Sequence, residues 1–340
     1  MNEETRGPSE RRKALGVGLG AGILGAVALA LRYGWKESLR RIIPDEISPA
    51  VFATRVADTS GGEIVYHTAE PSFPAPPLLF LHGVFPGASS FEWSRVYVRF
   101  AETHRVLVPD LVGFGESHRP SRPLAAEGQV RSLSEFLDGI CPGTPAVVVA
   151  SGLTANIALL LASRHPDKIS RLLLWMPDIA LGKANPSRGW HRLGWFPRLA
   201  RLVYRRQLST EAFLRSWLPR AGYPPEAPGF EETVSVLSST AQQYGAEHAF
   251  LALCSRSYWK GLRTGLRSLS PDVTLLLAKG AGRDSQAPFT DLIPLLNRFS
   301  VAEIDSPGDL ATLSRPGEVA AAIAAELLPP QATPSAAGTI

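Results

Sequence analysis

The stretch from Ala146 to Ile169, AVVVASGLTANIALLLASRHPDKI, constrains the fold more than any other part of the chain. Its first four residues are apolar, which is typical of a short strand buried on both faces. Small residues follow, and apolar side chains then recur at helical spacing until His165 and Pro166. A buried strand that turns sharply into a helix predicts an α/β architecture with a mostly parallel sheet.

The rest of the chain repeats this alternation of short strands and helices. Two strands, Val51–Asp58 and Glu63–Thr68, are joined by the hairpin signal Ser60-Gly61-Gly62. Further strands are expected at Leu78–Leu81, Arg105–Pro109, Val273–Ala278 and Phe299–Ile304, and helices at Phe91–Ala101, Val130–Ile140 and Pro316–Leu328. The pattern is interrupted between residues 178 and 269. We therefore expect a core formed by residues 51–177 and 270–328, with residues 178–269 as a helical cap.

Composition describes an ordinary globular protein. Hydrophobic residues make up 45% of the 340 residues and charged residues 19%, with a mild net charge of +4. No zinc-finger, RNA-binding or helix-turn-helix signature is present, so no nucleic-acid partner is expected. Cys141 and Cys254 form no C-x-x-C pair and are read as free thiols, with a single disulfide left open. No cofactor and no metal site are expected.

The amino-terminal segment carries an apolar run that contrasts with the rest of the chain. Residues 14–31 contain no charged residue and follow the basic cluster Arg11-Arg12-Lys13. This length lies at the lower end of the roughly 17–25 residues that span a bilayer core. We expect residues 1–31 to form a tail and a single-pass membrane anchor, with residues 32–50 as a juxtamembrane linker. The alternative is a signal peptide that is cleaved on export. Residues 329–340 are expected to be a disordered tail.

Several motifs together resemble the α/β-hydrolase superfamily. LLFLHGVFPGASSFEW, residues 78–93, is similar to the family's strand and oxyanion loop. RVLVPDLVGFGES, residues 105–117, resembles the next strand with its D-x-x-G-x-G-x-S turn, and ASRHPDKISRLLLW, residues 162–175, resembles a helix end and the following strand. The resemblance covers about residues 51–328 and implies an α/β-hydrolase fold with a helical cap.

The resemblance also implies where a nucleophile and an oxyanion hole would lie. The family holds its nucleophile in a turn of the pattern small-x-nucleophile-x-small. Here Ala150 and Thr154 take the small positions, and the residue between them is Gly152, which has no side chain to attack with. The oxyanion loop is present: His82 and Gly83 fit the motif, and the N–H groups of Val84 and Leu153 would point at the oxyanion.

The family's base histidine normally follows the last strand. Aligning Gly308 and Pro316 with that segment places Asp309 at the histidine position, and no histidine occurs after His248. The orienting acid would be Asp284, with Asp178 as the alternative. The resemblance therefore implies a degenerate catalytic triad at Gly152, Asp284 and Asp309.

Three functions are compatible with these residues. The main hypothesis is a membrane-anchored protein without serine-hydrolase activity that binds an apolar or lipid-like ligand or a membrane partner. The second is an active ester or lipid hydrolase with an atypical site, in which Ser151 is the nucleophile or Asp309 activates a water molecule above Gly152. The third is a structural subunit of a membrane complex. Whether the chain is an enzyme stays open at this point.

The expected cap is rich in arginine. Between Arg188 and Arg220 there are eight arginines, with Glu211 as the one acid. Pro197 suits the first turn of a helix that carries Leu199, Leu202 and Val203 on one side. Such a helix could lie on an anionic lipid surface or cover the core with its apolar face while its arginines are solvated.

Overall fold

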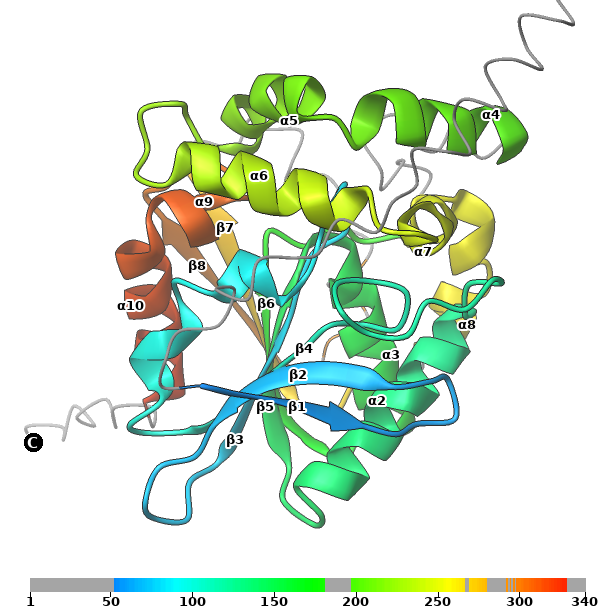
Figure 1. Ribbon diagram of the computed structural model, residues 1–340. Helices are drawn as coiled ribbons and strands as arrows, with labels where there is room; N and C mark the ends of the chain where they lie inside the picture. Colours follow the sequence, from blue (N-terminus) through cyan, green and yellow to red (C-terminus); the bar gives the residue numbers. More distant parts are fainter. Residues whose placement is uncertain are drawn as a thin grey trace, which may run out of the picture. The chain divides into compact units, whose positions relative to one another are not determined.

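The described part of the chain is built around one eight-stranded sheet (Figure 1). The computed structural model describes residues 52–180, 197–266, 269–279, 292, 294, 296 and 298–328. The strand order is β1-β2-β4-β3-β5-β6-β7-β8. β2 is antiparallel to both β1 and β4, and all other neighbours are parallel, which confirms the expected α/β-hydrolase type of sheet.

The strands lie close to where the apolar pattern predicts them. Their bounds are β1 Ala53–Ala57, β2 Ile64–Ala69, β3 Pro77–Leu81, β4 Arg105–Pro109, β5 Ala146–Ser151, β6 Ile169–Trp175, β7 Asp272–Ala278 and β8 Phe299–Ile304. The first two form the predicted hairpin, with Ala53 opposite Thr68 and Ala57 opposite Ile64. β5 extends two residues beyond the predicted apolar run, and this brings Ser151 into the sheet.

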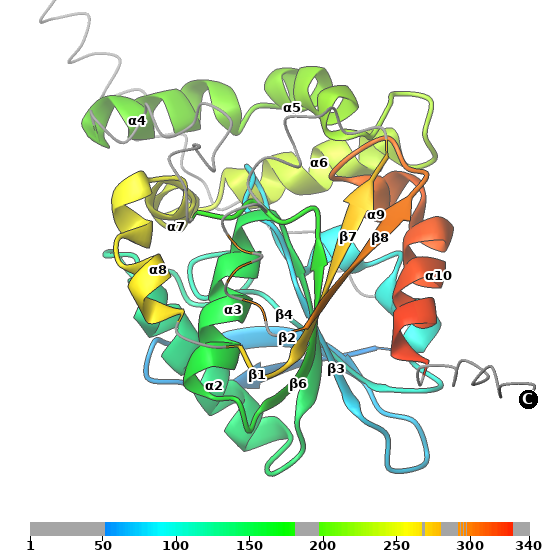
Figure 2. The ribbon, with the colours of Figure 1, turned by 180° about the vertical axis from the view of Figure 1, so that it is seen from behind.

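Alternate side chains of the strands fill two apolar cores, one on each face of the sheet. Leu79 and Leu81 pack with the helices α2 Ala126–Ile140 and α3 Ala155–Arg164. Leu78 and Phe80 belong to the core on the opposite face, together with side chains of the helix α10 Pro316–Leu327. This helix lies on the other side of the sheet from α2 and α3 (Figure 2). Burial on both faces explains why these strands are almost wholly apolar.

The predicted helix Phe91–Ala101 is wrong. The segment forms two short 3₁₀ turns, η2 Ser90–Trp93 and η3 Tyr97–Phe100. Within η2, Phe91 packs in the core on the α2 face, whereas Trp93 packs in the core on the α10 face. The Trp93 indole N–H also donates to the Leu81 carbonyl at 3.0 Å, which fixes η2 against β3.

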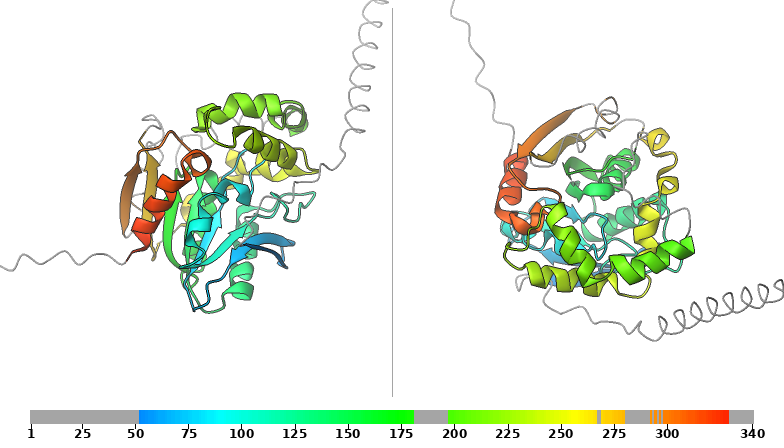
Figure 3. Two further views of the ribbon diagram at one scale, coloured as in Figure 1. Left: turned by 60° about the vertical axis from the view of Figure 1, so that its left-hand side comes forward. Right: turned by 90° about the horizontal axis from the view of Figure 1, so that it is seen from above.

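The cap consists of helices that lie across the end of the sheet where β3 and β5 finish (Figures 1 and 3). Its elements are α4 Pro197–Val203, the π-helix η6 Tyr204–Leu208, α5 Glu211–Trp217, η7 Leu218–Ala221, α6 Phe230–Ala241, α7 Ala246–Leu253, η8 Arg256–Trp259 and α8 Leu262–Gly265. The short helix α9 Ala311–Ser314 lies before α10. Pro197 lies in α4, where the sequence predicts a helix.

The side of α4 that carries Leu199 and Leu202 does not cover the core. Leu199 is 53% exposed and Leu202 is 48% exposed, while Ala200 and Tyr204 are buried. The prediction that these leucines cover the core is therefore wrong. The helix contacts α7 instead through its other side.

The predicted anchor at residues 14–31, the linker at 32–50 and the tail at 329–340 lie outside the described residues. Among the residues that are described, no helix combines the length and the apolar character needed to cross a bilayer.

Candidate active site

The turn that follows β5 has the sharp backbone expected of a nucleophile elbow. Gly152 stands at its tip with φ +55°, in the left-handed region that glycine adopts without strain. The 3₁₀ turn η4 Gly152–Thr154 leads into α3, and the Thr154 hydroxyl donates to the Ser151 carbonyl at 2.8 Å. Among the described residues, a Cβ at Gly152 would meet no atom within 4 Å. The elbow therefore has room for a side chain, and this chain places none there.

His82 connects the oxyanion loop to the following strand and is completely buried. Its Nε2 accepts from the Leu111 N–H at 3.1 Å, so Nδ1 carries the proton and donates to the Gly83 carbonyl at 2.8 Å. Burial lowers the pKa of the His82 imidazole, which stays neutral. Both ring nitrogens are occupied by backbone partners, so His82 holds the loop and is not a base for the elbow.

Glu92 joins the oxyanion loop to the elbow. Its Oε2 accepts from the Gly83 N–H at 2.5 Å, and its Oε1 accepts from the Ser151 hydroxyl at 2.6 Å. Only 1% of this side chain is exposed. Burial raises the pKa of Glu92 to about 7, since the two hydrogen bonds only partly offset it and the nearby Asp309 carboxylate adds to it. Glu92 is therefore a positioning residue that titrates near neutral pH.

Sequence reasoning missed Glu92. One signal for it is present: Glu92 is the one charged residue in the segment LLFLHGVFPGASSFEW, which is otherwise apolar or small apart from His82. A charge inside a segment that must be buried requires a partner. The partner, Ser151, is 59 residues away, and only the fold brings the two together.

Asp309 lies in the loop after β8, at the same end of the sheet. The Trp175 indole N–H donates to its carbonyl at 2.7 Å, and the next residue, Leu310, donates its N–H to the Ala221 carbonyl at 2.8 Å. Its carboxylate is close enough to Glu92 to raise the pKa of Glu92. The structure therefore brings Asp309, Ser151 and the oxyanion loop to one site.

The Asp309 loop touches the cap through two glycines. A Cβ on Gly222, which follows η7, would lie 2.7 Å from the backbone nitrogen of Gly308. Gly222 has φ +88° and Gly308 has φ +153°. No side chain fits between the two segments, so the end of η7 and the loop that carries Asp309 are in direct backbone contact.

Of the two candidate acids, the structure describes Asp178. Its N–H donates to the Gly152 carbonyl at 3.1 Å, and its carbonyl accepts from the Asn156 side-chain amide at 2.8 Å. These bonds hold the chain after β6 directly behind the elbow. The Asp178 side chain is half-buried. Asp284 lies outside the described residues.

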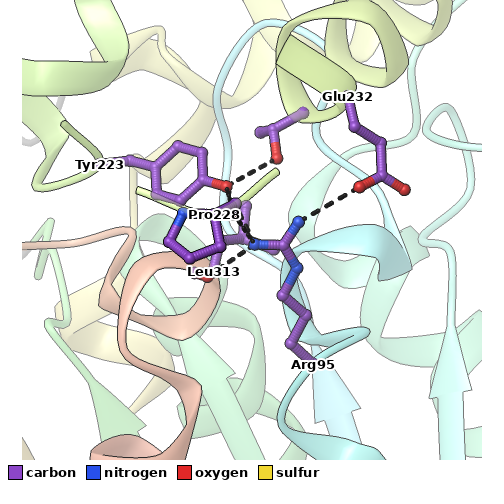
Figure 4. A network of polar contacts seen from close by, with 6 residues as sticks. Arg95, Tyr223, Pro228, Glu232 and Leu313 are labelled. Atoms are coloured by element: carbon purple, nitrogen blue, oxygen red, sulfur yellow. Dashed lines mark hydrogen bonds and ion pairs between the residues drawn. The ribbon is translucent and has the colours of Figure 1, made fainter. Parts of the chain in front are cut away.

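A second polar network ties the core to the cap beside this site (Figure 4). Arg95 Nη1 donates to the Tyr223 hydroxyl at 2.9 Å, to the Pro228 carbonyl at 2.8 Å and to the Leu313 carbonyl at 3.0 Å. Its Nη2 lies 3.4 Å from Glu232 on α6. One guanidinium thus connects the end of η2, the cap and α9, which follows the Asp309 loop.

Neither cysteine belongs to this arrangement. Cys141 and Cys254 are both buried and free. Burial raises the pKa of each thiol, which keeps the thiols protonated at neutral pH. Across the described ranges, no group of three His, Cys, Asp or Glu side chains is placed to hold a metal ion.

Comparisons with known proteins support the α/β-hydrolase fold. The model of the alpha/beta hydrolase family matches residues 78–322. The chain is 30% identical over 182 residues to a 2-hydroxymuconate semialdehyde hydrolase of Pseudomonas putida, covering 50% of this chain and 62% of that protein. It is 35% identical over 100 residues to the enzyme of the same name from Pseudomonas sp. strain CF600, covering 29% and 35%. The alignments thus span about a third to three-fifths of these relatives.

A solved structure gives the same result for the fold. The 2-hydroxy-6-oxo-6-phenylhexa-2,4-dienoate hydrolase of Rhodococcus sp. strain RHA1 superimposes with a TM-score of 0.65 at 19% identity, covering 81% of this chain and 98% of that one. At this identity the likeness concerns the fold alone. The family match covers more than half of the sequence, and the chain belongs to the alpha/beta hydrolase family.

Proposed function

We propose that this protein is a hydrolase of ester or related acyl bonds whose attacking group is a water molecule. The observation that carries the proposal is Gly152, which keeps the left-handed elbow while the described residues leave open space where a nucleophilic side chain would stand. The relatives named as hydrolases support turnover in this fold. A side chain that is absent cannot form an acyl-enzyme, so direct attack by water without a covalent enzyme intermediate is the chemistry left to this elbow.

In this proposal Asp309 is the general base and the oxyanion loop stabilises the developing charge. The water oxygen attacks the carbonyl carbon, and the proton it loses passes to the Asp309 carboxylate. The carbonyl oxygen becomes an oxyanion that accepts hydrogen bonds from the N–H groups of Val84 and Leu153. When the intermediate collapses, the bond to the alcohol breaks and Asp309 returns the proton to the leaving oxygen.

Ser151 is not the nucleophile in this proposal. Its backbone is extended, at φ −101° and ψ +139°, and the residue is buried at the end of β5. Its hydroxyl donates to Glu92 beneath Gly83, where an added Cβ on Gly83 would lie 3.2 Å from both side chains. The hydroxyl therefore lies under the oxyanion loop and not above the tip of the elbow.

Turnover of p-nitrophenyl acetate by the purified protein tests the proposal. We expect Asp309→Asn to lower kcat by about 10²–10⁴-fold, because general-base catalysis contributes that much. Asp305→Asn changes an exposed carboxylate of the same loop and should leave kcat unchanged. A fluorophosphonate probe should leave the protein unlabelled, and stoichiometric labelling of Ser151 would contradict the proposal, as would equal rates in Asp309→Asn and the parent.

The second candidate is binding of an apolar or lipid-like ligand without turnover, with a degenerate triad at Gly152, Asp284 and Asp309. The same glycine favours it, because a family member without a nucleophile can retain its ligand site. Saturable binding of a substrate analogue with no release of nitrophenol would favour this candidate over the hydrolase.

We also propose that the protein lies at an anionic membrane, held by residues 14–31 and by the basic face of the cap. The basic face consists of Arg198, Leu199, Arg201, Leu202, Arg205 and Arg206. All six side chains are exposed, and they combine apolar groups with positive charge on two consecutive helical elements. This combination favours the interface of an anionic bilayer. This proposal also includes a membrane-protein partner that binds the anchor formed by residues 14–31.

Co-sedimentation with phosphatidylserine vesicles tests the basic face. A chain that lacks residues 1–31 isolates the contribution of the cap, and the double variant Arg198→Gln/Arg201→Gln should bind about 30-fold more weakly, at about 1 kcal/mol per arginine. Arg131→Gln, an exposed arginine of α2, is the matched control. Equal binding of the double variant and the control would contradict a role for this face.

A further inference from the structure

One buried side chain joins the two backbone segments that carry the expected oxyanion donors. Glu92 Oε2 accepts from the Gly83 N–H at 2.5 Å, and Glu92 Oε1 lies 2.6 Å from the Ser151 hydroxyl oxygen. Gly83 directly precedes Val84, and Ser151 lies two residues before Leu153. The Glu92 carboxyl group therefore holds the oxyanion loop in a fixed position relative to the elbow.

Glu92 is enclosed without a positive partner. Only 1% of the residue is exposed, and the charged group that acts on it among the described residues is Asp309, which is also an acid. Arg95, at the end of η2, turns its guanidinium to the Tyr223 hydroxyl and the Pro228 carbonyl instead. A buried carboxylate that faces another carboxylate and no cation is strongly disfavoured, and such a group takes up a proton.

The titratable groups on two other neighbouring elements supply no counter-charge. His82, which follows β3, is neutral and has backbone partners at both ring nitrogens. Asp110, which follows β4, accepts from the N–H groups of Ser90 and Glu116. Burial accordingly raises the pKa of Glu92 to about 7.

The hydrogen bonds fix the position of the Glu92 proton. The Gly83 N–H can only donate, so Oε2 must remain an acceptor. A hydroxyl group can donate or accept, so the proton lies on Oε1 and is donated to the Ser151 hydroxyl oxygen. When Glu92 loses this proton, the direction of one hydrogen bond is reversed, and the Ser151 hydroxyl donates to the carboxylate.

We propose that Glu92 positions the oxyanion hole and that its carboxyl group must be neutral for the hole to work. This inference deepens the proposed hydrolysis and rests on it. Asp309 is partly exposed and carries the negative charge of the general base, while the buried Glu92 keeps a proton. An ionised Glu92 would place a second negative charge beside the residue that precedes Val84, where the oxyanion develops. Like charges at short range in a buried site repel each other, so ionisation of Glu92 opposes the reaction.

The pH dependence of kcat/KM for p-nitrophenyl acetate tests this role, because it reports ionisations of the free protein. After subtraction of spontaneous hydrolysis, we expect kcat/KM of the full chain to fall about tenfold or more on the alkaline side of about pH 7. Glu92→Gln keeps both hydrogen bonds without an ionisable group, so its alkaline fall should be absent. Glu102→Gln, which alters an exposed glutamate, should match the parent. The same alkaline fall in Glu92→Gln would overturn the proposal.

Ser151→Ala changes the midpoint in a direction that a merely structural role would not produce. The Ser151 hydrogen bond lowers the pKa of Glu92 because it favours the carboxylate. Its removal raises that pKa, so the alkaline fall should move to higher pH while turnover persists below it. Loss of turnover at every pH in Ser151→Ala, with a folded protein, would overturn the proposal in favour of Ser151 as the nucleophile.

Amide NMR of the full chain provides a measurement that needs no turnover. The Gly83 N–H binds Glu92 directly, so its resonance should titrate with a midpoint near pH 7 in the parent and stay constant in Glu92→Gln. If the parent hydrolyses no ester, the proposed hydrolysis is wrong, and a Gly83 titration then still supports the neutral Glu92. A Gly83 resonance that does not depend on Glu92 would overturn the inference whether or not the protein is a hydrolase.

Discussion

Replacing Glu92 by glutamine should abolish a fall of about 3 kcal/mol in the free energy of unfolding that the parent shows between pH 4.5 and pH 7.5. The folded protein keeps the Glu92 proton up to about pH 7, while the unfolded chain releases it near the ordinary value of 4.5. The folded state therefore binds more protons in this window, and the free energy of unfolding of the parent falls as pH rises through it. The difference of about 2.5 pKa units corresponds to about 3 kcal/mol. The variant lacks this ionisation, so its advantage over the parent should grow with pH.

Glutamine preserves the geometry that Glu92 provides. Its side-chain oxygen can accept from the Gly83 N–H, and its NH₂ group can donate to the Ser151 hydroxyl. Urea denaturation at each pH measures the difference, and Glu102→Gln, which alters an exposed glutamate, should run parallel to the parent. A parallel profile for Glu92→Gln as well would show that Glu92 does not ionise within this window.

The second large effect is expected at Arg95. Arg95→Met should lower the free energy of unfolding by about 2–4 kcal/mol, because it removes three hydrogen bonds from a charged donor and leaves the Leu313 carbonyl without that partner. The loss should appear as easier separation of cap and core. Relative to the parent, hydrogen exchange should speed up more in α6 and α9 than in β5.

Arg99→Met is the matched control, since Arg99 is exposed and lies only four residues further along the chain. Its free energy of unfolding should stay within about 0.5 kcal/mol of the parent. If Arg95→Met lies within the same range, the network in Figure 4 does not hold the cap to the core.

The sheet could be predicted because buried strands impose a simple pattern on the sequence. Val147–Val149 and Leu172–Leu174 are apolar at every position, since each face of the sheet is covered. The turn at Gly152 could be predicted for a related reason: only small residues fit between a strand and a helix that begin so close together.

The parts that could not be predicted depend on contacts between distant segments. The role of Glu92 becomes clear only from its hydrogen bonds to the Gly83 N–H and the Ser151 hydroxyl, which the fold brings to its carboxylate. Phe91 and Trp93 of η2 pack in the cores on opposite faces of the sheet, and helical spacing alone does not reveal this arrangement.

The contact between Gly222 and Gly308 has a consequence for protein engineering. Cap exchange between relatives is an obvious route to new substrates, and a chimera made in this way inherits whatever residue the donor has after η7. Any side chain there would collide with the main chain beside Asp309. Libraries that randomise the cap should therefore keep Gly222 and Gly308 fixed, because a side chain at either position would push the loop that carries Asp309 out of place.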